Sequence, residues 1–167
     1  MWKFVKKKLF ERQFKKAFSN QIANTPPTQF SIGILYGPET LDISRFSSII
    51  QKEYTLEPTI FTFNPEPHSE VTKYSKKDVN WLGIPKNEGV QQFLKTPLTI
   101  LFVINPQDLI HLHYIASLHP SLFKCSQRHY GKFDAFYNLT VEMPDNLPDD
   151  ELLAEMIQTI NRLKITI

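Results

Sequence analysis

The most continuous apolar run in the chain lies near its middle, from Leu98 to Asn105, directly after Pro97. A strand with one wet face would alternate apolar and polar residues, and this segment does not alternate. An unbroken apolar run is typical of a parallel strand that is covered on both faces. We therefore expect a central strand here, in a sheet of the α/β class.

The rest of the chain predicts strands and helices in alternation. Apolar or alternating runs bounded by turn residues predict four more strands, at 30–36, 59–64, 122–126 and 133–142. Apolar residues that recur at intervals of three and four predict helices at 2–21, 43–54, 87–95, 108–119 and 148–164. The period of two in the last strand predicts an edge strand with one partly wet face.

This alternation implies right-handed crossovers and an open, mostly parallel five-stranded sheet with helices on both faces, a three-layer αβα fold. The third and first strands are the most apolar and belong in the centre, which favours the flavodoxin-like order 2-1-3-4-5. Residues 24–28 contain two prolines and read as a linker. We expect a helix at 1–23 and a single α/β domain at 29–167.

The predicted strand order gives one place where a ligand could bind. Ligands of open α/β sheets bind at the point where the strand order reverses, which here lies between the first and third strands. The loops after these strands supply seven crevice candidates: Tyr36, Gly37, Glu39, Thr40, Asn105, Gln107 and Asp108. The same residues can equally be turn residues and helix caps, which any such fold needs. The chain has no glycine-rich phosphate loop, so no cofactor is predicted.

The histidines and the cysteine give only weak chemical signals. His111 and His113 are two residues apart on a predicted helix, so they point about 200° apart and cannot share a metal ion. His119 lies two turns beyond His111, and we expect solvated or helix-end histidines rather than a metal site. Cys125 could be activated by its basic neighbours Lys124, Arg128 and His129, but a short strand favours a buried thiol. No catalytic residue is predicted, which favours a protein that is not an enzyme.

Charge is distributed very unevenly along the chain. The first 20 residues carry one carboxylate and seven cationic side chains, a net charge of +6: Lys3, Lys6, Lys7, Lys8, Arg12, Lys15 and Lys16. The whole chain carries only +2, so the remaining residues carry −4. The sequence therefore joins a basic N-terminal helix to an acidic body.

Three partners could accept such a helix: an anionic membrane surface, a nucleic acid, or an acidic protein surface, including the body of the same chain. The acidic body would be repelled by nucleic acid, so this partner is disfavoured. Three phenylalanines recur at intervals of four in this segment: Phe10, Phe14 and Phe18. Their rings share one face of the predicted helix and would be buried against another surface. We expect partial docking on the body with a cationic face left exposed.

The composition agrees with a soluble protein of a reducing compartment. Cys125 is the only cysteine, so no internal disulfide can form. No apolar stretch approaches the roughly 20 residues that span a bilayer, and no secretory signal is evident. We expect a cytoplasmic location, with peripheral attachment to a membrane as an option.

The segment Ser75 to Pro85 contains the element Lys-Asp-x-x-Trp-x-Gly, followed by a short helix and by Pro97 before the apolar strand. In these features the chain resembles a family of small, uncharacterised bacterial proteins of unknown function, which also begin with a Lys-rich helix. The resemblance supports the α/β architecture and implies no substrate or cofactor. Trp81 within this element is either an interaction residue or a hydrophobic plug over the sheet.

Two hypotheses for function follow. The preferred one is a non-catalytic α/β protein that uses its basic helix to attach to a partner or an anionic surface. The alternative is a small-ligand or nucleotide-binding domain, with an enzyme as one form of it, that uses the crevice after the first and third strands.

Overall fold

The computed structural model describes residues 27–37, 43–62, 72–73, 88–128, 131, 133–144 and 147–164. The strands are β1 (Ile32–Tyr36), β2 (Thr59–Thr62), β3 (Thr72–Lys73), β4 (Ile100–Ile104), β5 (Phe123–Gln127) and β6 (Leu139–Val141). The helices are α2 (Ile43–Tyr54), α3 (Glu88–Lys95), α4 (Ile110–Leu118) and α5 (Asp149–Arg162), with a short 3-10 helix η2 (Asp134–Phe136). The expected basic helix at 1–23 lies outside the described residues.

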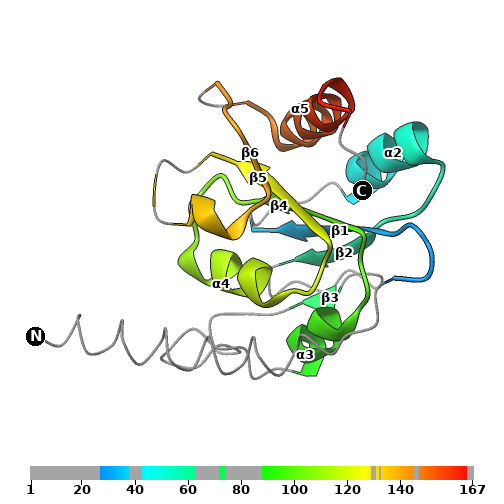
Figure 1. The fold of residues 1–167 in the computed structure, drawn as a ribbon, viewed down its shortest axis with the longest axis vertical. Coiled ribbons are helices and arrows are strands. Elements are labelled where there is room, and N and C mark those ends of the chain that lie inside the picture. The colour runs from blue at the N-terminus through cyan, green and yellow to red at the C-terminus, as the bar shows by residue number, and fades with distance from the viewer. Residues whose placement is uncertain are drawn as a thin grey trace, which may run out of the picture.

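All the described strands are parallel and form one sheet in the order β3-β2-β1-β4-β5-β6. The five longer strands follow the predicted order 2-1-3-4-5, and β3 adds a two-residue strand outside β2. Strand β4 lies between β1 and β5, as its apolar sequence predicts (Figure 1). The strand order therefore reverses between β1 and β4.

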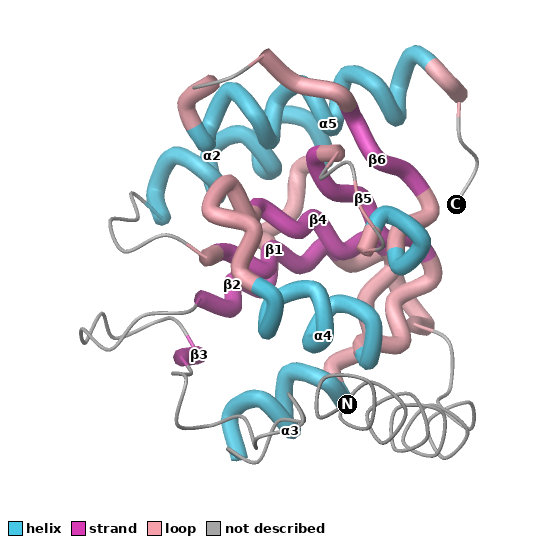
Figure 2. The backbone as a smooth tube through the Cα atoms, turned by 90° about the vertical axis from the view of Figure 1, so that its left-hand side faces the viewer, coloured by secondary structure: helices cyan, strands magenta, loops and turns pink. Residues whose placement is uncertain are grey.

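Helices cover both faces of the sheet, so the three-layer prediction is confirmed. Helices α2 and α5 lie on one face and α3 and α4 on the other (Figures 1 and 2). Along β4, Ile100, Phe102 and Ile104 belong to the core under α2 and α5. Leu101 and Val103 belong to the core under α3 and α4. Both sets are buried, which is why this strand shows no polar alternation.

The predicted edge strand at 133–142 is wrong in its first half. The amide of Phe136 donates to the Phe133 carbonyl, 2.9 Å away, and residues 134–136 form η2 rather than a strand. Phe133 and Tyr137 are both buried on the α4 side. Their spacing of four fits a helical turn as well as a period of two, so the pattern could not distinguish the two. The second half is confirmed, because β6 is an edge strand with half-buried residues.

No helix in the described part of the chain is both long enough and apolar enough to cross a membrane. The longest, α5, instead has a polar side and a buried side. Leu153, Met156 and Ile157 pack on the sheet, while the first turn carries three carboxylates. This division is typical of a helix on the surface of an α/β domain.

Candidate functional site

The carboxyl ends of β1, β4 and β5 bring three polar positions together. Tyr36 is the last residue of β1, Asn105 follows β4, and Gln127 ends β5. The strand registers place Tyr36 beside Ile104, and Val103 beside Ser126. Side chains at this edge therefore lie at the expected point of strand reversal.

The Tyr36 side chain packs on the face of the sheet that α2 and α5 cover. Its hydroxyl donates to Asp149 Oδ2 over 2.6 Å, and its ring meets that of Phe46 edge to face. Burial raises the pKa of Tyr36 far above its ordinary value, and the carboxylates of Asp149 and Asp150 raise it further. The hydroxyl therefore stays protonated and links β1 to the start of α5.

Gly37 lets α4 approach the end of β1. A Cβ atom at this position would lie 2.5 Å from Leu112 Cδ1 and 3.4 Å from Asn105 Oδ1. Its amide donates to the Ile104 carbonyl over 3.1 Å. The α4 side of the predicted crevice is therefore filled by Leu112 at this point, and any larger residue would displace that side chain.

Asn105 holds the loop between β4 and α4. Its Oδ1 accepts the Leu109 amide at 2.8 Å, and its Nδ2 donates to the Leu109 carbonyl at 3.1 Å. Its own amide donates to Gln127 Oε1 at 3.2 Å. Asn105 therefore acts as a turn residue, whereas Gln107 and Asp108 in the same loop are exposed.

Asp108 has a left-handed backbone with a φ of 50°. This conformation is uncommon for a residue with a side chain, although Asp and Asn tolerate it best. The Asp108 side chain is 57% exposed, yet its Oδ1 lies 2.8 Å from His113 Nε2. The Asp108 carboxylate is therefore exposed to solvent and also contacts a buried side chain.

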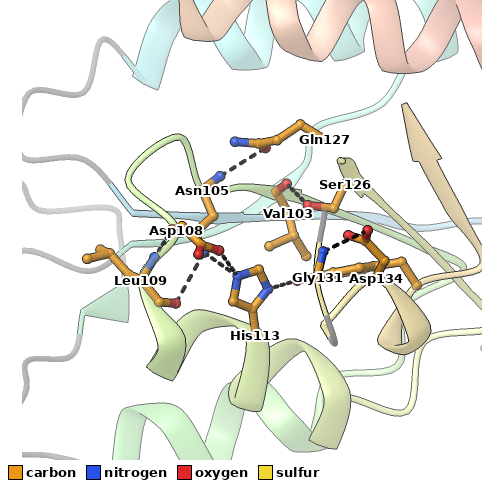
Figure 3. A network of polar contacts seen from close by, with 10 residues as sticks. Val103, Asn105, Asp108, Leu109, His113, Ser126, Gln127, Gly131 and Asp134 are labelled. Atoms are coloured by element: carbon orange, nitrogen blue, oxygen red, sulfur yellow. Dashed lines mark hydrogen bonds and ion pairs between the residues drawn. The ribbon is translucent and has the colours of Figure 1, made fainter. Parts of the chain in front are cut away.

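His113 is the centre of a buried polar network (Figure 3). Its Nδ1 lies 2.5 Å from the Tyr137 hydroxyl, and its ring stacks on Phe133 with centroids 4.5 Å apart. Burial lowers the pKa of His113, while Asp108 and Asp134 act in the opposite direction. The expectation of a solvated histidine is wrong, because α4 carries His113 on its buried side.

His119 is a helix-end histidine, as expected, because it is the C-cap residue of α4, but it is buried rather than solvated. Its Nδ1 accepts the Ser121 amide at 3.1 Å, and its Nε2 lies 3.1 Å from the Phe93 carbonyl. Burial, together with the nearby charge of Lys124, lowers the pKa of His119 to about 3. His119 therefore fastens α3 to the end of α4 as a neutral ring.

Lys124 is a buried lysine on the same face. Its Nζ donates to the Ser117 carbonyl at 3.5 Å, near the C-terminal end of α4. Burial lowers the pKa of Lys124 to about 8. The neighbouring Cys125 points to the other core, and burial raises the pKa of its thiol to about 12. Cys125 is thus a buried thiol, as its strand position predicts, and carries no thiolate near neutral pH.

Among the residues that the structure describes, no three His, Cys, Asp or Glu side chains are grouped so that they could hold a metal ion. The crevice candidates Glu39 and Thr40, and Trp81, lie outside the described residues. So do the seven basic residues of the N-terminal segment.

Comparison with known families adds one finding. The profile of a family of unknown function (DUF6913) matches residues 4–163. The chain belongs to this family. No curated protein and no solved structure matches it. The resemblance to a family of unknown function, inferred from the Lys-Asp-x-x-Trp-x-Gly element, is thereby confirmed.

The extent of the match is informative for this DUF6913 protein. It includes the whole α/β domain, with Asn105, Asp108, His113 and Tyr137, and it begins at residue 4. Six of the seven basic residues of the N-terminal segment therefore lie in the region that defines the family. Sequence reasoning missed His113 and Tyr137 because their partners come from a loop and a 3-10 turn, for which spacing predicts no geometry.

Proposed function

We propose that this DUF6913 protein is a non-catalytic α/β protein that attaches through its basic N-terminal segment, residues 1–23, to a protein partner or an anionic surface. One observation carries the first part of this proposal. Three groups of the described domain that could do chemistry, His113, His119 and Cys125, are fully buried and belong to the packing. None of these three side chains is exposed to a substrate in this structure.

The distribution of charge supports the second part. The first turn of α5 carries Asp149, Asp150 and Glu151, and Asp150 forms an ion pair with Arg45 over 3.4 Å. The rest of the chain is net acidic and the N-terminal segment is strongly basic, so the segment would attract an anionic partner that the body would repel. The family match includes most of this segment, which supports a role shared by the family.

We infer a cytoplasmic, bacterial setting for this protein, with attachment at a membrane surface as one form of the proposal. The lone, buried Cys125 supports a reducing compartment. Nucleic acid is disfavoured as a partner because the acidic body would be repelled by phosphates.

A second candidate function is the binding of a small ligand or nucleotide at the carboxyl edge of the sheet. Its support is Gln127, which is only 7% exposed. Gln127 uses Oε1 to accept the Asn105 amide, while its amide nitrogen makes no hydrogen bond to a described residue. A stabilising nucleotide whose effect is lost in Gln127→Met would favour this candidate over attachment.

The attachment proposal is tested by neutralising three charges together, in Lys6→Gln, Lys7→Gln and Lys8→Gln. Each lysine near an anionic membrane contributes about 1 kcal/mol, so binding to phosphatidylglycerol-containing vesicles should fall roughly a hundredfold. Co-sedimentation measures this, and affinity capture from cell extract detects a protein partner. Binding by the unmodified chain should also weaken between low and physiological salt.

A matched control neutralises three cations of the body, in Lys52→Gln, Lys95→Gln and Arg162→Gln, and should leave binding unchanged. Equal binding by the two triple variants would contradict the proposal. So would a full-length chain that binds neither vesicles nor a partner.

A further inference from the structure

The carboxyl edge of the sheet, where β1, β4, β5 and β6 end, gathers negative charge. Carboxylates lie in the loop after β4, directly after β6 and in the first turn of α5: Asp108, Glu142, Asp149, Asp150 and Glu151. The Tyr36 hydroxyl at the end of β1 donates to Asp149, which places this turn of α5 at the same edge. Two arginines at this edge form ion pairs with these carboxylates: Arg45 with Asp150, and Arg128 with Glu142. Carboxylates thus outnumber cations here among the described residues.

Gln127 directs a buried donor into the same edge. It ends β5 on the face that α2 and α5 cover, since it lies two residues after Cys125, and it is only 7% exposed. Its Oε1 accepts the amide of Asn105 at the end of β4, so the side chain leans across β4 toward β1, with its amide nitrogen directed away from Asn105 (Figure 3). No described residue accepts a hydrogen bond from this nitrogen, so it is open to an acceptor from another molecule.

The opposite, amino edge of the sheet carries positive charge. Three helices have a cation in their last turn: Lys52 in α2, Lys95 in α3 and Arg162 in α5. Helices that connect parallel strands run back to the amino edge, and the ends of α2 and α5 lie on the side where β1 begins (Figure 1). The basic segment joins the domain at this edge too. Residues 27–31 lead into β1, and the Ser31 hydroxyl donates to the Pro97 carbonyl ahead of β4.

We propose that copies of this protein associate head to tail, with the basic N-terminal segment of one copy, residues 1–23, bound to the acidic carboxyl edge of the next copy at Asp150, Glu151 and Gln127. This inference rests on the proposed function for the binding role of the segment, and it names a second copy of this chain as the protein partner. Such an interface joins two different surfaces of the same chain, so it produces rings or open chains of copies.

The two surfaces are complementary in charge and in hydrogen bonding. The first 20 residues carry seven cations and one carboxylate, which attracts them to an edge with an excess of carboxylates. Glu151 is exposed and the Asp150 side chain is 29% exposed, so a lysine can reach both. The segment also contains acceptors for the Gln127 amide, among them Glu11 and Gln13. A peptide supplies both kinds of group, whereas a simple cation supplies no acceptor.

A second copy fits the acidic edge better than the segment of the same chain does. The segment joins the domain at the amino edge, and β1, with five residues, separates the two edges by about 17 Å. To reach its own carboxylates, the segment would have to run back along the domain past the cationic last turns of α2 and α5. Lys52 and Arg162 in these turns repel it. The acidic edge of a neighbour is reached without this path.

The first test measures self-association of the full-length chain by sedimentation velocity. At low salt we expect species larger than a monomer, which dissociate as the salt concentration rises. The double variant Asp150→Asn, Glu151→Gln should weaken association about tenfold or more. The matched control Glu53→Gln, Glu57→Gln removes two exposed carboxylates at the amino edge and should not weaken it. The NMR signal of the Gln127 side-chain amide should shift on association, and an unchanged signal would place the interface elsewhere.

A mixing experiment separates association between copies from binding within one copy. The variant Lys6→Gln, Lys7→Gln, Lys8→Gln keeps the acidic edge, and the variant Asp150→Asn, Glu151→Gln keeps the basic segment. At a concentration where the unmodified chain associates, each variant alone should be mostly monomeric. An equal mixture should form dimers and nothing larger, because only one pair of complementary surfaces is intact.

Monomers in the mixture would overturn the proposal, and so would an unmodified chain that is monomeric at low salt. Monomers whose melting temperature depends on salt only while the carboxylates are present would show binding within one copy, which also overturns it. The proposed function is decided separately. If the unmodified chain is monomeric but still binds vesicles through its lysines, attachment stands and head-to-tail association fails.

Discussion

Replacing Phe102 with alanine should lower the free energy of unfolding by about 3–5 kcal/mol. Phe102 is fully buried at the centre of β4, with Ile34 of β1 on one side and Cys125 of β5 on the other. The substitution leaves a cavity under α2 and α5 that the two neighbouring strands cannot close. Equilibrium denaturation in urea measures the loss, which is a large fraction of the stability of a domain of this size.

The matched control is Phe30→Ala, the same substitution at a ring that is 46% exposed and touches Tyr54 at the end of α2. Its cost should be well below that of Phe102→Ala, because less apolar surface is lost. Equal losses at the two positions would contradict the central placement of β4. They would also remove the basis for a site at the point of strand reversal.

Replacing Lys124 with methionine should stabilise the protein by about 2 kcal/mol at neutral pH. Lys124 has a pKa of about 8 in the folded state, against an ordinary value of 10.5. Its ammonium group is therefore less favourable in the fold than in the unfolded chain, and this cost is fully present below pH 8. Methionine keeps an unbranched chain of similar length and removes the charge.

The gain from Lys124→Met should shrink as the pH rises. Between about pH 8 and 10.5 the unfolded chain binds one proton more than the folded chain at this residue, so the unmodified protein becomes relatively more stable. Urea denaturation at pH 7 and at pH 9.5 measures the difference. The control Lys52→Met, at an exposed position on α2, should show no such change. A destabilised Lys124→Met variant would mean that the bond to the Ser117 carbonyl outweighs burial.

The fold was predictable where the sequence pattern reports burial directly. The apolar run of β4 predicts a strand covered on both faces, and the structure has Leu101 and Phe102 in the two different cores. The pattern fails at Phe133 and Tyr137, because their spacing of four fits both a strand and a helical turn. One-dimensional periodicity cannot separate these two cases without the partner, which here is the His113 ring on α4.

The candidate site was predictable only in outline. The carboxyl ends of β1 and β4 are neighbours, and Tyr36, Gly37 and Asn105 lie at that edge. The contacts that these side chains make could not be predicted. The partner of the Tyr36 hydroxyl, for example, is 113 residues away along the chain. The burial of His113 and His119 was missed for a related reason. Burial of these two rings is tolerated because Asp108, Tyr137 and backbone groups form hydrogen bonds with them. The spacing of residues along α4 does not predict these partners.

We propose that the basic N-terminal segment, residues 1–23, attaches this DUF6913 protein to a protein partner or an anionic surface. The most direct measurement compares the full chain with a chain that lacks these residues, for binding to phosphatidylglycerol-containing vesicles and to partners captured from cell extract. We expect the shortened chain to lose the salt-sensitive binding while it still melts in a cooperative transition, with any fall in melting temperature reporting how far the segment docks on the body. Undiminished binding by the shortened chain would contradict attachment through residues 1–23.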